Sequence, residues 1–186
     1  MNVNYANIVD NTSNIIFITG GTKSGKSEFA EHLAKEAKNL SYVALSENNM
    51  EDKEWQEKIK VHRKRRPKDW KLIETTDLLN TLSNEDGPLL IDSIGGFVME
   101  SIEKEHKEWC RKMHLLISLL MRRKNITYIV GEQVCWSLVS EYKIGNTYIE
   151  RIGELQKRIT KISKDNWLAI NGRAIKIDEI SIEIPT

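Results

Sequence analysis

The sequence predicts an α/β fold in which helices cover both faces of a mostly parallel sheet. Short apolar runs rich in β-branched residues alternate with stretches of helical periodicity along almost the whole chain. Because parallel strands need long crossover connections, this alternation favours a parallel sheet. The 186 residues, of which 40% are hydrophobic and 30% charged, suffice for one sizeable core.

Seven segments are expected to form strands, because each is a short apolar run. They are residues 14–19, 41–45, 70–74, 88–92, 126–130, 167–170 and 174–177. The last two flank Asn171-Gly172, a dipeptide that is typical of two-residue hairpin turns. A C-terminal hairpin is therefore expected beside the parallel strands.

Five segments are expected to form helices. They are residues 26–38, 50–66, 76–83, 96–123 with a break near 103–107, and 146–163. In the first, Phe29, Leu33 and Ala37 recur at helical spacing. Pro67 is expected to end the second, which is amphipathic and highly charged.

The chain is expected to form a single domain over residues 15–186, after a flexible leader at residues 1–14. The leader is polar and lacks the basic start and apolar core of a secretory signal. No run of 18 apolar residues occurs, so we expect no membrane insertion, and the missing secretory signal favours a cytoplasmic location. Lys and Arg total 28 against 27 Asp and Glu, and this net charge of +1 gives no reason to expect a nucleic-acid partner.

A phosphate-binding loop is the strongest motif. It matches G-x-x-x-x-G-K-[ST] in full, between a predicted strand and a predicted helix. The glycines let backbone N–H groups turn toward phosphate oxygens, and the helix adds its positive dipole end. Lys26 is expected to contact the β- and γ-phosphates, and Ser27 to ligate Mg²⁺. The loop consists of Gly20, Gly21, Thr22, Lys23, Ser24, Gly25, Lys26 and Ser27.

A second magnesium ligand is expected at Asp92. This residue ends an apolar run, as the metal-binding acid of phosphate-loop proteins does. An aspartate at the end of a strand is also common as a cap or turn residue, which is the alternative here.

The densest positive cluster is His62-Arg63-Lys64-Arg65-Arg66-Pro67-Lys68. Charge alone leaves three interpretations open: a solvated helix end, a nucleic-acid patch, or an arm over nucleotide phosphates. Cationic neighbours favour a neutral imidazole at His62. A neutral imidazole is a competent nucleophile at phosphorus, although a packing or hydrogen-bonding role is the common alternative for a lone histidine.

Taken together, these motifs resemble the bifunctional adenosylcobinamide kinase/adenosylcobinamide-phosphate guanylyltransferase family of cobalamin biosynthesis. The blocks follow the family order from about residue 15 to residue 177. They are the phosphate loop, Tyr42-Val43-Ala44, an H-R-x-x-R-P block at 62–67, and residues 90–95 and 130–134. The H-R-x-x-R-P block at this distance behind the loop is the more specific sign, because the loop alone fits many families.

The resemblance implies a three-layer, RecA-like phosphate-loop NTPase fold that often forms trimers. It also implies two reactions. ATP or GTP with Mg²⁺ would phosphorylate adenosylcobinamide with the help of Lys26, and His62 would then pass GMP from GTP to adenosylcobinamide phosphate. Glu74 would accept hydrogen bonds from guanine, and Ser27 and Asp92 would bind the metal. The family's nucleotide contacts fall at Thr19 to Lys26, Ala44, Leu45, Ser46, Arg63, Lys64, Arg65, Arg66, Glu74 and Asp92.

Three segments of the second half depart from the family pattern. Glu132-Gln133-Val134-Cys135 replaces Asn-Glu-Val-Gly, residues 137–140 replace Gly-Ile-Val-Pro, and Tyr148-Ile149-Glu150 replaces Phe-Arg-Asp. These departures bear on the corrinoid site and on subunit contacts. Two other functions stay open: a phosphate-loop small-molecule kinase in which His62 is structural, and a nucleotide-switch or RNA-binding module that uses the basic run.

Overall fold

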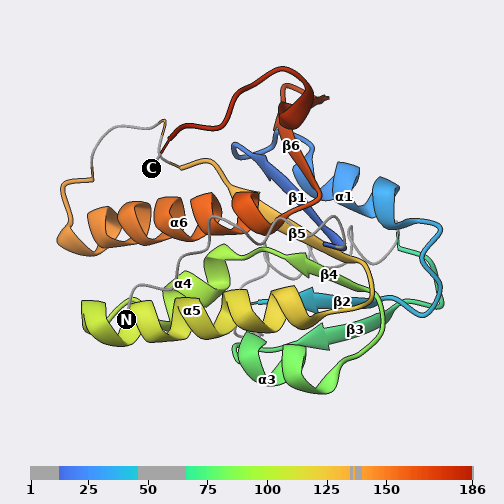
Figure 1. Ribbon diagram of the computed structural model, residues 1–186, viewed down its shortest axis with the longest axis horizontal. Coiled ribbons are helices and arrows are strands. Elements are labelled where there is room, and N and C mark those ends of the chain that lie inside the picture. The colour runs from blue at the N-terminus through green and yellow to red at the C-terminus, as the bar shows by residue number, and fades with distance from the viewer. Residues whose placement is uncertain (1–12, 46–65, 135, 137–139, 186) are drawn as a thin grey trace, which may run out of the picture.

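The computed structural model describes residues 13–45, 66–134, 136 and 140–185. Its centre is a seven-stranded sheet in the order β3-β2-β4-β5-β1-β6-β7 (Figure 1). The pairs from β3 to β6 are all parallel, and β7 runs antiparallel to β6. The strands are β1 (Ile15–Gly20), β2 (Ser41–Ala44), β3 (Lys71–Glu74), β4 (Leu89–Asp92), β5 (Thr127–Glu132), β6 (Asp165–Ile170) and β7 (Arg173–Lys176).

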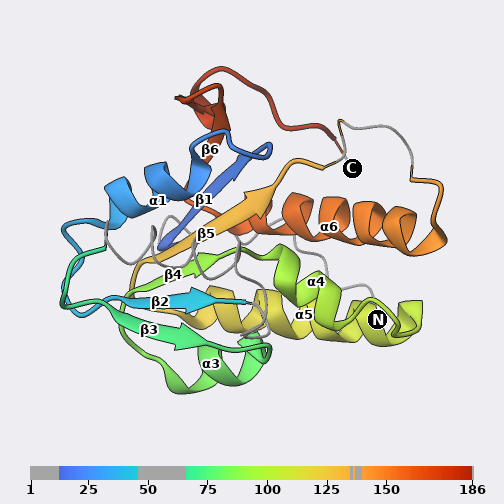
Figure 2. The ribbon, with the colours of Figure 1, turned by 180° about the vertical axis from the view of Figure 1, so that it is seen from behind.

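Helices cover both faces of this sheet. Helices α3 to α6 lie on one face and α1 lies on the other, as the two opposite views show (Figures 1 and 2). The predicted α/β architecture is therefore confirmed. The helices are α1 (Lys26–Ala34), α3 (Leu78–Asn84), α4 (Gly95–Glu100), α5 (His106–Arg122), α6 (Lys143–Ile162) and the short 3₁₀ helix η2 (Ile177–Glu179).

Alternate residues of the central strands enter two separate cores. Phe17 and Ile91 pack toward helices α3 to α6, whereas their neighbours Ile18 and Leu90 pack toward α1. All four are at most 2% exposed. Strands buried on both faces appear in a sequence as continuous apolar runs rather than as alternating ones, which is why these segments were recognisable.

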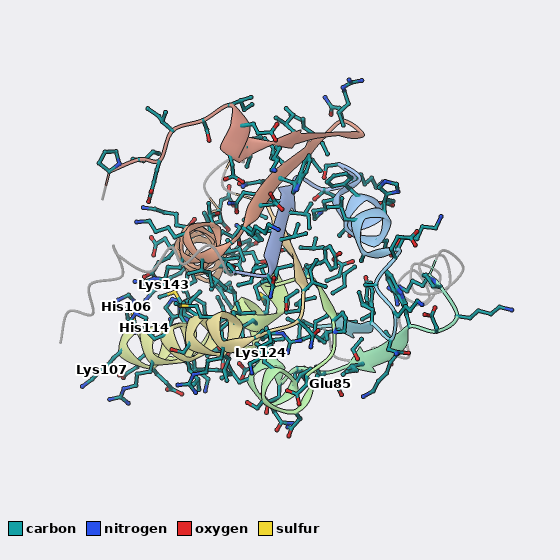
Figure 3. All side chains as sticks on the ribbon, turned by 45° about the vertical axis from the view of Figure 1, so that its right-hand side comes forward. Glu85, His106, Lys107, His114, Lys124 and Lys143 are labelled. Atoms are coloured by element: carbon teal, nitrogen blue, oxygen red, sulfur yellow. The ribbon has the colours of Figure 1, made fainter. Side chains whose placement is uncertain are left out.

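Helix α5 shows why a sequence with so many charges still packs. Trp109, Met113 and Leu116 recur at intervals of four and three residues and are fully buried. Lys107 and His114, on the other side of the same helix, are exposed (Figure 3). This spacing places one apolar stripe against the sheet and leaves the polar face to water.

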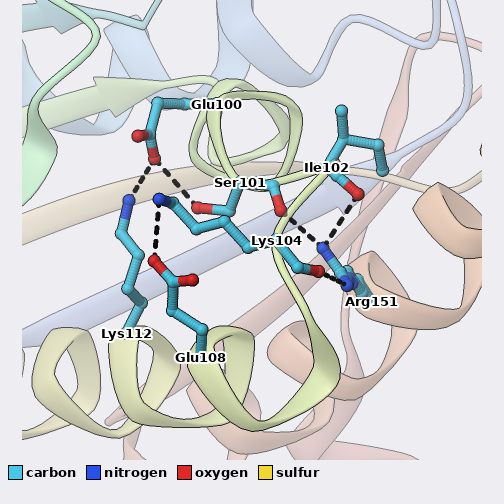
Figure 4. A network of polar contacts seen from close by, with 7 residues as sticks. All are labelled: Glu100, Ser101, Ile102, Lys104, Glu108, Lys112 and Arg151. Carbon is cyan, nitrogen blue, oxygen red and sulfur yellow. Dashed lines mark hydrogen bonds and ion pairs between the residues drawn. The ribbon is translucent and has the colours of Figure 1, made fainter.

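The expected break in the segment 96–123 is confirmed between α4 and α5. A buried arginine from α6 forms hydrogen bonds with the backbone of this connection. Arg151 of α6 donates to the carbonyl oxygens of Ser101 (2.5 Å), Ile102 (3.2 Å) and Lys104 (2.5 Å) (Figure 4). Carbonyls at a helix end have no partner within the helix, so a cation from a neighbouring element satisfies them. On the outer side, Lys112 pairs with Glu100.

Some expected boundaries differ from the structure. Helix α1 ends at Ala34 rather than at residue 38, because the chain tightens there into a turn in which the Ala37 N–H donates to the Ala34 carbonyl at 2.9 Å. Asn39 then adopts a left-handed conformation (φ 55°) on the way into β2. The helix expected over 50–66 lies largely outside the described residues.

The C-terminal hairpin is confirmed. Asn171 (φ 49°) and Gly172 (φ 74°) both have positive φ, as a two-residue type I′ turn requires, and Ile170 pairs with Arg173 across it. At the other end of the described chain, the side chain of Ser13 donates to the Ile162 carbonyl. No helix among the described residues has the length and hydropathy needed to cross a membrane.

Candidate nucleotide-binding site

The carboxyl ends of the parallel strands bring the predicted site residues to one edge of the sheet. Gly20 pairs with Glu132 across β1 and β5, and Ala44 pairs with both Glu74 and Asp92. Strand β5 therefore separates the phosphate-loop strand from the strand that ends in Asp92. Ligands of open α/β sheets bind at such an edge, where strand order is not sequential.

The loop after β1 has the conformation that a phosphate cradle needs. Lys23 (φ 57°) and Gly25 (φ 92°) take positive φ, and Gly25 is the N-cap residue of α1. Such backbone turns point N–H groups into a concavity that favours anions. The Lys26 ammonium lies over this loop and donates to the Gly21 carbonyl at 3.1 Å.

Strand β6 and the hairpin turn support the loop from behind. A Cβ atom at Gly20 would lie 2.5 Å from both the Ala169 carbonyl oxygen and the Ser24 hydroxyl oxygen, so only glycine fits without rearrangement. The Gly172 N–H donates to the Ser24 carbonyl at 3.1 Å. The hairpin thus fixes the turn that carries Ser24 and Gly25.

Ser27 and Asp92 meet across the edge, as the motif predicts. The Ser27 hydroxyl donates to Asp92 Oδ1 at 3.3 Å, although 65 residues separate the two in sequence. A hydroxyl and a carboxylate are oxygen ligands of the kind that Mg²⁺ prefers. The donor set therefore fits a magnesium ion that accompanies a bound nucleotide.

The second oxygen of Asp92 is held by a tyrosine that the sequence analysis did not single out for a role in the site. The Tyr42 hydroxyl donates to Asp92 Oδ2 at 2.5 Å. The Arg66 guanidinium carbon lies 3.3 Å from the Tyr42 ring centroid, and Trp70 stacks near the same ring. Burial, with a further contribution from the Asp92 charge, raises the pKa of Tyr42 far above its usual range, so the hydroxyl remains protonated.

A second carboxylate at this edge was also missed. Glu132 ends β5 and accepts a hydrogen bond from the Ser93 hydroxyl. Burial raises the pKa of Glu132, while Ser93 and the Lys26 charge oppose the rise. Its Oε2 atom has no hydrogen-bond partner among the described residues. An acid at the end of an apolar strand was the available signal, the same signal that identified Asp92.

The remaining predicted residues lie at different distances from the loop. Thr19 is buried within β1, and its hydroxyl donates to the Trp167 carbonyl at 3.4 Å. Glu74 ends β3, four strands from β1, so that about 19 Å of sheet separates the two. A nucleotide that contacts Lys26 and Glu74 together would have to lie along the edge, across Asp92. Five predicted residues lie outside the described part of the chain: Ser46, His62, Arg63, Lys64 and Arg65.

Comparison with known families decides the relationship. The family model described as cobinamide kinase / cobinamide phosphate guanyltransferase matches residues 16–177. The chain belongs to this family. Its members are transferases, so the protein is classed as an enzyme, and the resemblance inferred from the sequence blocks is confirmed.

Two curated relatives have the same description, "Bifunctional adenosylcobalamin biosynthesis protein CobU". The relative from Escherichia coli (strain K12) is 24% identical over 181 residues, and the one from Salmonella typhimurium (strain LT2) is 25% identical over 181 residues. Each alignment covers 88% of this chain and 99% of the relative. This member of the cobinamide kinase family is therefore distant in sequence from both, but matches them over nearly their whole length.

A solved structure shares the fold. It is titled "Structural study of Project ID PH0250 from Pyrococcus horikoshii OT3" and aligns with a TM-score of 0.53 at 7% identity, covering 94% of this chain and 93% of that one. At such low identity the likeness concerns the fold alone. In this member of the cobinamide kinase family, Ser27 and Asp92 are in contact beside the phosphate loop.

Proposed function

We propose that this protein phosphorylates adenosylcobinamide with a nucleoside triphosphate and then transfers GMP from GTP to adenosylcobinamide phosphate. The single observation that carries the proposal is the contact of Ser27 with Asp92 at 3.3 Å beside Lys26 and the phosphate loop, in a chain that belongs to the cobinamide kinase family. This arrangement gathers a cation, a hydroxyl and a carboxylate where a triphosphate would lie.

The kinase step needs the γ-phosphate to be held and its developing charge to be stabilised. Lys26 and the loop N–H groups would bind the phosphates, and Ser27 and Asp92 would hold Mg²⁺, which supplies further positive charge to the phosphate oxygens. The hydroxyl oxygen of adenosylcobinamide would form a bond to the γ-phosphorus and release its proton to solvent, while the bond from that phosphorus to the leaving diphosphate breaks.

For the guanylyl step, His62 would be the nucleophile. An imidazole nitrogen would attack the α-phosphorus of GTP, forming an N–P bond as the bond to pyrophosphate breaks. A phosphate oxygen of adenosylcobinamide phosphate would then displace the histidine. Support comes from the H-R-x-x-R-P block and from Arg66, which stacks on the tyrosine that contacts Asp92. That contact would bring the cationic end of the block close to the bound triphosphate.

Covalent labelling tests this proposal. The protein is incubated with Mg²⁺ and GTP labelled at the α-phosphate, and is then denatured. We expect label to stay on the wild-type chain and to be labile in acid but stable in base, as a phosphoramidate is. His62→Ala should carry no label, whereas His114→Ala, which alters an exposed residue of α5, should label normally.

A second assay separates the proposal from its alternatives. Transfer of labelled γ-phosphate to cobinamide without any covalent GMP would leave a phosphate-loop small-molecule kinase. Absence of both signals, together with salt-sensitive binding of RNA, would favour the nucleic-acid module instead. Sedimentation of the purified protein would test the expected homo-oligomer, with a trimer as the state that the family resemblance implies.

A further inference from the structure

A continuous set of contacts connects Arg66, in the basic cluster at residues 62–68, to the pair formed by Asp92 and Ser27. The Arg66 guanidinium lies over the Tyr42 ring at 3.3 Å, the Tyr42 hydroxyl donates to Asp92 Oδ2 at 2.5 Å, and Asp92 Oδ1 accepts from Ser27 at 3.3 Å. Arg66 also lies 3.7 Å from Glu31 of α1, the helix that begins at the phosphate loop. Each member therefore touches the next.

The Tyr42 side chain is fixed on all sides. The residue is 2% exposed, Trp70 stacks at a centroid distance of 6.5 Å, and the ring belongs to the core between the sheet and α1. Its hydroxyl gives the Asp92 carboxylate a hydrogen bond from a fixed partner, in addition to the one from Ser27. The bond to Oδ2 leaves Oδ1 directed at Ser27, which is the side on which the motif expects the metal.

We infer that Tyr42 is a positioning residue of the metal site: its hydroxyl holds the Asp92 carboxylate in the orientation that binds Mg²⁺ with the nucleotide, and Arg66 fixes the ring from above. This inference rests on the proposed function, because it assumes that the loop binds a nucleoside triphosphate with its metal. Partners of this kind orient metal ligands in many sites, and their loss typically weakens metal binding about tenfold or more.

The test is Tyr42→Phe, which keeps the ring beneath Arg66 and removes only the hydroxyl. Tyr128→Phe is the matched control, because Tyr128 is also buried in the core beside α1, and its hydroxyl donates to the Leu33 carbonyl at 3.1 Å, away from the site. Mn²⁺ binding to the protein–GTP complex is measured by electron paramagnetic resonance, and GTP binding is measured separately in EDTA.

We expect Tyr42→Phe to bind Mn²⁺ in the GTP complex about tenfold more weakly, with metal-free GTP affinity unchanged. Tyr128→Phe should match the wild type in both. In the kinase assay, raising Mg²⁺ should restore Tyr42→Phe toward the wild-type rate, a rescue that a general loss of stability would not give.

Three results would overturn the inference. Mn²⁺ affinity of Tyr42→Phe within twofold of the wild type would show that the hydroxyl does not position Asp92. Equal weakening in Tyr128→Phe would show that any buried hydroxyl matters in this way. A wild-type protein that binds no Mn²⁺ with GTP would overturn the proposed function itself. This result can be told apart from a failure of the inference alone, because the wild type and both variants would then show the same lack of Mn²⁺ binding.

Discussion

The residues of the phosphate loop are constrained from two sides, by the ligand that the loop would hold and by the strand behind it. Gly20 shows the second constraint most clearly, since a side chain there would meet the Ala169 carbonyl oxygen at 2.5 Å. Backbone at this distance cannot move aside as a flexible side chain can. A substitution at Gly20 therefore tests the contact between the loop and β6. A substitution at the neighbouring Gly21 tests the side of the loop where a Cβ meets no described atom.

Gly20→Ala is expected to lower the free energy of unfolding by roughly 1–3 kcal/mol, the usual cost of an overpacked position, and to weaken GTP binding by displacing the loop. Gly21→Ala is the matched control, because a Cβ there meets no described atom within 4 Å. Urea denaturation and GTP titration of both variants provide the measurement. Equal stability of the two variants would contradict the close approach of β6.

Among the elements, the junction of α4, α5 and α6 is held by a buried cation from α6. Arg151 is 9% exposed and donates to three carbonyls of the connection between α4 and α5. Its guanidinium also lies 5.4 Å from the ring of Trp109, the largest fully buried side chain of α5. The expected break in the helical segment is thus stabilised by a residue far away in sequence.

Arg151→Met is expected to lower the free energy of unfolding by about 2–4 kcal/mol, because it removes three hydrogen bonds from the carbonyls of a largely buried connection. Arg158→Met, which removes a half-exposed arginine paired with Glu154 on the same helix, should cost about 1 kcal/mol or less. Thermal and urea denaturation followed by circular dichroism would measure both. A similar cost for the two variants would contradict the capping role.

A second connection between elements depends on pH. Glu85, at the end of α3 (Figure 3), accepts hydrogen bonds from Lys71 at 2.5 Å and from Ser41 at 3.0 Å, and so ties together the starts of β3 and β2. The hydrogen bond from the Lys71 ammonium is the main cause that lowers the pKa of Glu85 below its ordinary value of 4.5. Its stabilising contribution is therefore present above pH 4.5 and is lost as the pH falls through the lowered value.

We expect Glu85→Gln to be less stable than the wild type at pH 7 by up to about 1 kcal/mol, since the exposed Lys71 is screened by water. The difference should shrink as the pH is lowered below 4.5. Denaturation of both proteins at pH 7 and at pH 3.5 provides the comparison. A difference that is the same at both pH values would exclude the ion pair as its cause.

For the molecule as a whole, the site joins elements from both ends of the described chain, so ligand binding should stabilise the entire fold. At Mg²⁺–GTP concentrations of 100 times Kd, binding adds about 2.7 kcal/mol, which corresponds to a rise in Tm of roughly 5–10 °C for a chain of this size. Differential scanning fluorimetry would detect it. Lys26→Met should unfold at the wild-type temperature without ligand and show almost no rise with it.

Much of this architecture could be predicted from the sequence, because strands buried on both faces are continuous apolar runs and the turn Asn171-Gly172 has a distinctive chemistry. Lys26, Ser27 and Asp92 followed from motif spacing and strand position. The role of Tyr42 could not be predicted, since it depends on the register of β2 beside β4, which places its hydroxyl against Asp92. The predicted helix ends were the least accurate part of the prediction, because local turns such as the one after Ala34 determine where a helix stops.

The order of the strands also has a consequence for biosynthesis. Strand β1 and its loop are translated before the other described strands, but their neighbours in the sheet are β5 and β6, which are translated more than 100 residues later. The turn that supports Ser24 comes from Gly172. A nascent chain therefore carries an unpaired apolar strand until these neighbours have been made, and its phosphate loop gains its full support only after the hairpin turn at Gly172 has been translated.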